Sequence, residues 1–246
     1  MLISYEAGKE RPMFATIVNA ATIIVCSILG VVFKSKLNPR YTDSILTGLA
    51  IVVLILGASY ALNTEDFLGM IVCMSLGTRL GEGLRIEERM ERMGDGIRRR
   101  ILPKSGANNS FTEGFMSGSL LFCIGSMAIV GSMEAGINGN PTIILSKSVI
   151  DGIAAISLSM TMGIGVAFSG ISVLLYQGMI TLLASIAAPY LQDTVVLEMS
   201  AIGGILMIGI AINMLKLKKI KVGNMLPAVF LPILYQPVVA LITKLF

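Results

Sequence analysis

The chain has 246 residues, of which 54% are hydrophobic and only 14% are charged, and its mean hydropathy is +0.82. A water-soluble domain of this composition would have too little polar surface to cover its core, so the composition excludes that class and predicts a membrane protein. Histidine is absent, which excludes a histidine-based catalytic dyad and a histidine-ligated zinc protease site.

Eight segments are apolar and long enough to be membrane spans, since a helix needs roughly 20 residues to cross the hydrocarbon core. They cover residues 13–33, 44–62, 66–81, 111–135, 142–168, 170–188, 195–215 and 225–243. The sequence therefore predicts an all-α polytopic membrane protein with about eight transmembrane helices, in a single integral-membrane domain over residues 1–246. Pro227, Pro232 and Pro237 interrupt the last segment, which favours a broken or re-entrant helix there.

The basic residues are divided unequally between the two ends of these spans. Of nineteen Lys and Arg residues, four lie on one side, namely Lys9, Arg11, Lys147 and Lys244, and the other fifteen lie in the loops on the opposite side. Because short loops rich in Lys and Arg stay in the cytoplasm, we expect a multi-pass protein of the bacterial inner membrane with both termini outside. This pattern accounts for most of the positive charge, so the lipid bilayer is the expected partner and nucleic acid is not.

Residues 82–110 are predicted to form a cytoplasmic basic amphipathic helix and a loop. The helix has one narrow apolar stripe, formed by Ile86, Met90, Met93 and Ile97. Glu88 and Arg92 are placed to pair at i, i+4 on its charged side. The segment is interpreted either as a solvated or interface-lying helix that fixes orientation, or as a partner or regulatory site.

The fourth span is rich in Gly and Ser. Gly125, Gly131 and Gly136 lie in its second half and predict a broken or bent helix between residues 125 and 136. Two interpretations are open: close helix packing, and an interrupted helix that lines a polar cavity.

Ionisable side chains inside the apolar segments are the main functional signal. Lys147 and Asp151 are four residues apart and therefore share one helix face. They are interpreted either as a self-neutralising pair in which Lys147 reaches outward, or as part of a site for an ion or small polar solute that Asp151 forms with Glu198. The residues predicted to line such a path are Asp151, Glu198, Lys147, Glu134, Asn19, Gln177 and Asn213.

No catalytic, metal-binding or cofactor site is predicted. The three cysteines, Cys26, Cys73 and Cys123, lie in apolar runs and lack metal-ligand spacing. An intramembrane enzyme that uses Ser146 or Ser148 beside Lys147 is disfavoured, because side chains at i and i+1 do not face each other on a helix.

Six segments together carry a resemblance: "TIVNAATIIVCSILG", "RIEERMERMGD", "FTEGFMSGSLLFCIGSMAIVGSMEAG", "SKSVIDG", "LLYQGMITLLA" and "EMSAIGG". They resemble an uncharacterised bacterial integral-membrane family, domain of unknown function 554, also called YqgA-like. The resemblance covers nearly the whole chain and implies a bacterial inner-membrane protein, but it brings no activity with it.

Spans 1–3 and spans 6–8 are expected to cross the membrane in opposite senses, as in an inverted repeat. With polar groups inside Gly-interrupted helices, this order favours a small secondary transporter or permease for an ion or small polar solute, with a homo-oligomer as a compatible assembly. The alternatives are a structural or assembly subunit without transport activity and, least favoured, an intramembrane enzyme.

Overall fold

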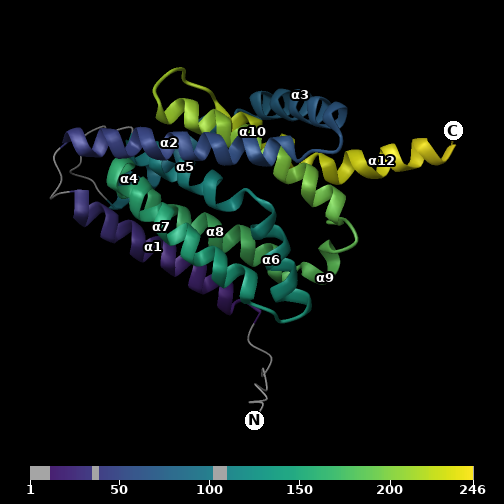
Figure 1. Ribbon diagram of the computed structural model, residues 1–246, viewed down its shortest axis with the longest axis horizontal. Helices are drawn as coiled ribbons and strands as arrows, with labels where there is room; N and C mark the ends of the chain where they lie inside the picture. Colours follow the sequence, from purple (N-terminus) through teal and green to yellow (C-terminus); the bar gives the residue numbers. More distant parts are fainter. Residues whose placement is uncertain (1–11, 35–38, 102–109, 246) are drawn as a thin grey trace, which may run out of the picture.

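The computed structural model describes residues 12–34, 39–101 and 110–245, and every regular element in these ranges is a helix. The elements are α1 (Phe14–Lys34), α2 (Pro39–Leu62), α3 (Phe67–Leu84), α4 (Ile86–Ile101), α5 (Ser110–Cys123), α6 (Ser126–Ile137), α7 (Thr142–Met162), α8 (Gly165–Leu182), α9 (Ala184–Ala187), α10 (Asp193–Met214), the 3-10 helix η1 (Val222–Met225), α11 (Leu226–Phe230) and α12 (Pro232–Leu245). The long helices run side by side along the long axis of the molecule (Figure 1).

Seven helical segments of the described chain are long and apolar enough to cross a membrane, and α5 with α6 makes an eighth if the bent pair is one span. The all-α polytopic architecture with about eight spans is therefore confirmed. The last of the seven covers residues 222–239 and consists of η1, α11 and the start of α12, so the proline-rich segment is interrupted as the sequence indicates.

The fourth span breaks at Gly125. Helices α5 and α6 meet at an angle of 60°, and Gly125 has φ 120° and ψ 149°, a region of backbone space that is essentially restricted to glycine. Gly131 and Gly136 lie inside the continuous helix α6, where they allow close approach to Ile143 of α7 and to the carbonyl group of Thr181. Of the three glycines predicted at a break, only Gly125 is at one.

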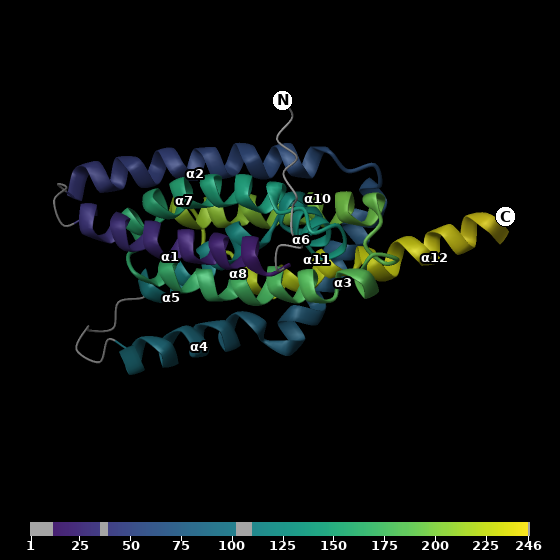
Figure 2. The same cartoon turned by 90° about the horizontal axis from the view of Figure 1, so that it is seen from below.

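Two helix pairs form the most extensive contacts among the described helices. Helix α1 packs along α7, and α2 packs along α10 (Figures 1 and 2). Gly57 and Gly204 face each other across the second pair, and a Cβ atom on either would collide with the backbone of the other helix. Because glycine has no side chain, the two helix backbones come into direct contact here. Close van der Waals packing of this kind stabilises helix pairs in membranes, where no hydrophobic effect acts between the helices.

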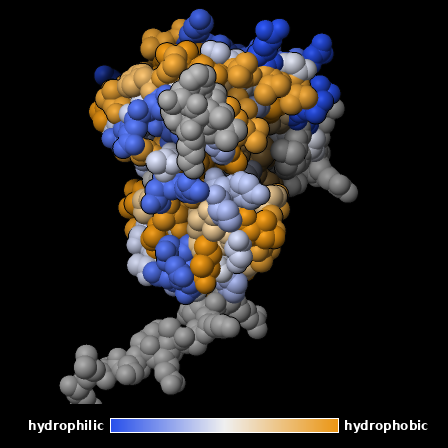
Figure 3. All heavy atoms as spheres, turned by 90° about the vertical axis from the view of Figure 1, so that its right-hand side faces the viewer, coloured by the Kyte–Doolittle hydropathy of each residue, from blue (hydrophilic) through white to orange (hydrophobic). Residues whose placement is uncertain are grey.

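Several of the described basic residues lie at one end of the bundle, which we call the basic end. There the Lys34 ammonium donates to the Thr161 carbonyl oxygen at 3.0 Å, and Lys216 lies 3.8 Å from the Asp43 carboxylate. The turn between α2 and α3 and helix α9 lie at the opposite end (Figure 1). Figure 3 views the molecule from that opposite end, where hydrophilic residues lie among hydrophobic ones.

Helix α12 projects from the bundle in both ribbon views (Figures 1 and 2). Helices α1, α2 and α3 each contact their expected counterparts α8, α10 and α11, an arrangement that an inverted repeat allows. The repeat itself stays a prediction.

Helix α4 lies outside the main bundle, beside α5 (Figure 2). The expected pair of Glu88 and Arg92 is present, with a carboxylate–guanidinium distance of 3.6 Å on the exposed side of the helix. The loop predicted after this helix falls on residues 102–109, outside the described residues, and so do the side chains of Met93 and Ile97.

Gly81 and Gly83 offer a matched test of the packing of α3. A Cβ atom at Gly81 would overlap the Asn224 carbonyl oxygen, whereas one at Gly83 meets nothing within 4 Å. Gly81→Ala should therefore destabilise the protein by about 1–3 kcal/mol through overpacking, and Gly83→Ala should stabilise it by about 0.5–1 kcal/mol through helix propensity. Thermal unfolding in detergent measures both changes, and equal effects of the two substitutions would contradict this packing.

Candidate functional site

A buried ion pair lies in the interior of α7. The side chains of Lys147 and Asp151 are only 7% and 8% exposed, and the Lys147 ammonium donates to the Asp151 carboxylate. The same ammonium donates to the main-chain carbonyl oxygen of Phe122 at 2.8 Å. Lys147 thus points into the protein, which corrects the interpretation that it reaches outward to the membrane surface.

The Phe122 carbonyl group is available to Lys147 because α5 ends at Cys123. The last carbonyl groups of a helix have no partner within the helix, and an unsatisfied carbonyl group inside the hydrocarbon region costs several kcal/mol. A cation is also favoured at a helix C-terminus by the helix dipole. The break at Gly125 and the cation of Lys147 are therefore two parts of one arrangement.

Two buried amide side chains extend this arrangement to α1 and α8. The Asn19 amide nitrogen donates to the Asp151 carboxylate at 3.2 Å and to the Gln177 side-chain oxygen at 3.1 Å, and neither amide is exposed. The Asn19 side-chain oxygen and the Gln177 side-chain nitrogen have no hydrogen-bond partner among the described residues. We call Asn19, Lys147, Asp151 and Gln177 the polar cluster.

Glu198 belongs to a different set of contacts. Its carboxylate accepts hydrogen bonds from the Thr64 hydroxyl at 2.6 Å, the Glu65 amide at 2.9 Å and the Asp66 amide at 3.2 Å. These groups form the turn from α2 to α3, so in the described structure Glu198 anchors this turn and does not join Asp151.

The other two predicted path residues also lie away from the polar cluster. Asn213 holds the chain after α10, because its side chain accepts from the Ile220 amide at 2.7 Å and donates to the Ile220 carbonyl at 2.8 Å. Glu134 accepts from the Asn138 side chain at 3.0 Å, near the end of α6. The structure thus brings together four of the seven predicted residues.

A second buried acidic site joins α4 to η1, and sequence reasoning missed it. The Glu87 carboxylate accepts from the Gly223 amide at 2.7 Å, and the Glu87 amide donates to the Asn224 side chain at 2.7 Å. Burial raises the pKa of the Glu87 carboxyl group, an effect that the Gly223 hydrogen bond opposes in part. The partners are more than 130 residues apart along the chain, and no local pattern marks them.

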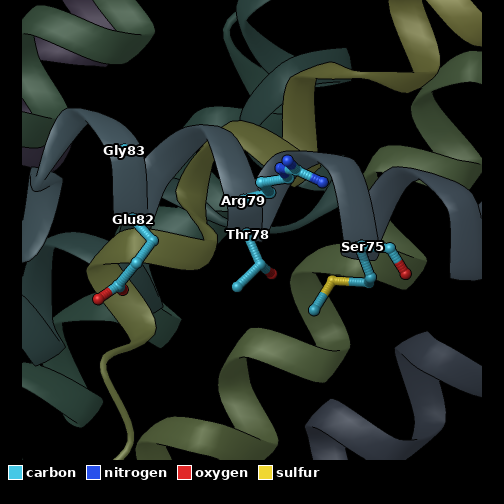
Figure 4. A pocket seen from close by; sticks show the side chains of 6 residues that line it. Ser75, Thr78, Arg79, Glu82 and Gly83 are labelled. Atoms are coloured by element: carbon cyan, nitrogen blue, oxygen red, sulfur yellow. The ribbon is translucent and has the colours of Figure 1, made fainter.

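An open groove of about 810 Å³ runs along α3 (Figure 4). Its lining consists of Met74, Ser75, Thr78, Arg79, Glu82 and Gly83. Because these residues all come from one helix, the groove is a surface of α3 and not an enclosed site. In the described part of the chain, no three His, Cys, Asp or Glu side chains converge as metal ligands.

The comparisons with known proteins agree with the membrane architecture. A family model described as "Protein of unknown function (DUF554)" matches residues 14–236. The uncharacterized membrane protein YdfK of Bacillus subtilis is 30% identical, over 95% of this chain and 98% of that protein. The uncharacterized protein YqgA of Escherichia coli is 26% identical, over 87% of this chain and 92% of that protein. No solved structure matches.

Removal of one or both members of the ion pair tests their coupling. Lys147→Met should destabilise the protein by about 3–5 kcal/mol, because it leaves the Asp151 carboxylate buried without its cation. Addition of Asp151→Leu to that variant should recover only part of the loss, because it removes the unpaired carboxylate but leaves the Phe122 carbonyl group without the Lys147 donor. Unfolding of the single and double variants in detergent gives the coupling energy, and additive losses would contradict a coupled pair.

The pKa of Glu87 predicts a pH effect on the contact between α4 and η1. Because the folded state raises this pKa, the carboxyl contributes stability that is present below its ordinary pKa and is lost as the pH rises through the raised value. The side chain introduced by Glu87→Gln stays neutral. The free energy of unfolding of this variant relative to that of the parent should therefore increase as the pH rises across this window. Unfolding of both proteins over a pH series measures the difference, and a pH-independent difference would overturn the prediction.

Proposed function

The chain belongs to the DUF554 family of proteins of unknown function, and from that premise we propose that it is a small secondary transporter or permease for an ion or small polar solute. The observation that supports this most is the ion pair of Lys147 and Asp151 inside a membrane-spanning helix. Charged side chains at this depth are costly and by default indicate a functional site.

The polar cluster has the components that solute or ion binding requires. Asp151 supplies a carboxylate, and Phe122 supplies a carbonyl group at a helix break. The Asn19 oxygen and the Gln177 nitrogen add an acceptor and a donor that the described residues leave unpaired. Broken helices with such groups near the middle of the membrane are typical of binding sites in secondary transporters.

Depth within the membrane is consistent with this role. Asp151 lies nine residues after Thr142, where α7 begins, which corresponds to about 14 Å at the helical rise of 1.5 Å per residue. The hydrocarbon core is about 30 Å thick. The carboxylate is therefore near the centre, where binding alternately from either side is geometrically simplest.

We further propose the orientation in which the basic end faces the cytoplasm of a bacterial inner membrane and both chain termini lie outside. The positive-inside rule supports this choice, since Lys34, Lys216, Lys219 and Lys221 gather at that end.

A structural subunit without transport activity is the second candidate, and one observation favours it. Lys147 and Asp151 neutralise each other and bond the end of α5, so the pair has a structural use without any ligand. Transport requires in addition that Asp151 exchange Lys147 for another partner during the cycle.

Asp151→Asn should abolish solute-dependent current while the protein still inserts, because the shape of the side chain is kept and its charge is lost. Electrophysiology on proteoliposomes with a panel of amino acids, organic acids, sugars and monovalent cations measures this current. Asp193→Asn is the matched control, since Asp193 is exposed in the first turn of α10.

A neutral pair, Lys147→Gln with Asp151→Asn, separates the two candidate functions if the single variant does not fold. If the protein is a transporter, this variant should lose the current of the parent protein. If the protein is a structural subunit, the variant should remain folded, and neither protein should carry a current. Absence of current from the parent protein across the whole panel would count against electrogenic transport. Full current from the folded double variant would show that the transport path does not use the ion pair.

A further inference from the structure

A cavity of about 240 Å³ lies beside the break in the fourth span, apart from the polar cluster. Its lining comes from α4, α5, the break after α5, α6, α8, α10, and α11. The lining residues that matter most for its chemistry are Ser119, Leu120, Ile129, Ser172 and Val229. The cavity thus lies between the two interrupted spans, the fourth and the eighth.

The break itself separates the cavity from the polar cluster. The Phe122 carbonyl group bonds Lys147, whereas the next three residues, Cys123 to Gly125, line the cavity. Neither Lys147 nor Asp151 is part of the lining. A molecule in the cavity would therefore contact the same break that the ion pair holds.

The chemistry of the lining excludes a charged occupant. None of the lining residues carries a formal charge at neutral pH, and most of them are aliphatic, aromatic or Met. A charged group placed among them would lose its hydration without gaining a partner of opposite charge, which is strongly unfavourable.

One part of the lining is able to form hydrogen bonds. The Ser119 and Ser172 hydroxyl groups bond each other at 2.9 Å across α5 and α8. A hydroxyl group can donate one hydrogen bond and accept two, so the pair keeps capacity for another partner. The aliphatic side chains of Leu120, Ile129 and Val229 are also in the lining and suit an apolar body.

The volume limits the occupant to a small molecule. At about 30 Å³ for each water molecule, the cavity corresponds to on the order of eight waters. We propose that it binds an uncharged amphiphile of about this size, with an apolar body and one hydroxyl or carbonyl group directed at Ser119 and Ser172. An uncharged amphiphile partitions into a bilayer or micelle without a transporter, so this site is independent of the proposed transport activity.

The probe for this proposal is 4-fluorobenzyl alcohol, followed by fluorine NMR with the full chain in detergent micelles. The alcohol should show line broadening in excess of that in empty micelles. The charged analogues 4-fluorobenzylamine and 4-fluorobenzoate should show none. Equal excess for all three compounds, or none for the alcohol, would overturn the proposal.

Three substitutions place the binding in the cavity. Ser172→Leu fills the space and should remove the excess broadening, whereas Ile171→Phe, which enlarges a side chain that is 48% exposed on the same helix, should leave it unchanged. Ser172→Ala removes only the hydroxyl group, so it should weaken the alcohol signal and spare that of 4-fluorotoluene. Broadening that is unaffected by both Ser172 variants would locate the probe elsewhere and refute the site.

Discussion

The Lys147 ammonium is the group on which the interior of this protein depends. A span that breaks inside hydrocarbon must give its freed carbonyl groups new partners, and Lys147 supplies one to Phe122. A buried cation then requires an anion, which Asp151 provides on the same helix, and the carboxylate in turn accepts from Asn19. The break between α5 and α6 thereby fixes the relation of α1, α5 and α7.

Two further carboxylates join other parts of the chain. Glu198 binds the turn between α2 and α3 from α10, and Glu87 joins α4 to η1. Glu198 accepts from two main-chain amides that precede α3, and Glu87 accepts from the Gly223 amide of η1. The helix dipole favours negative charge at the start of a helix. The long apolar faces then need only shape complementarity, which the contact of Gly57 with Gly204 illustrates.

Hydropathy was sufficient to predict the approximate positions of the spans, although α7 ends at Met162 and not at the predicted residue 168. The spacing of Lys147 and Asp151 was sufficient to predict that they share a face. The sequence could not predict that Lys147 points inward. Its acceptor is the main-chain oxygen of Phe122, and every residue type has that atom. The separate place of Glu198 was equally hidden, since depth in the membrane does not determine which neighbour a side chain faces. Glycine content predicted the break and gave Gly125 as one of three candidate positions. It could not distinguish the three, because glycine serves both strained backbone at Gly125 and close packing at Gly131.

The contact between Asn19 and Asp151 has a consequence for biosynthesis. The two residues are 132 positions apart, and at a synthesis rate of about 5–20 residues per second the ribosome needs roughly 7–26 s to travel from one to the other. Helix α1 therefore enters the bilayer with a polar amide whose partner has not yet been made. The other residues of α1 are apolar enough for the helix to insert by itself. Asn19 then lacks its Asp151 partner until α7 has been synthesised and inserted.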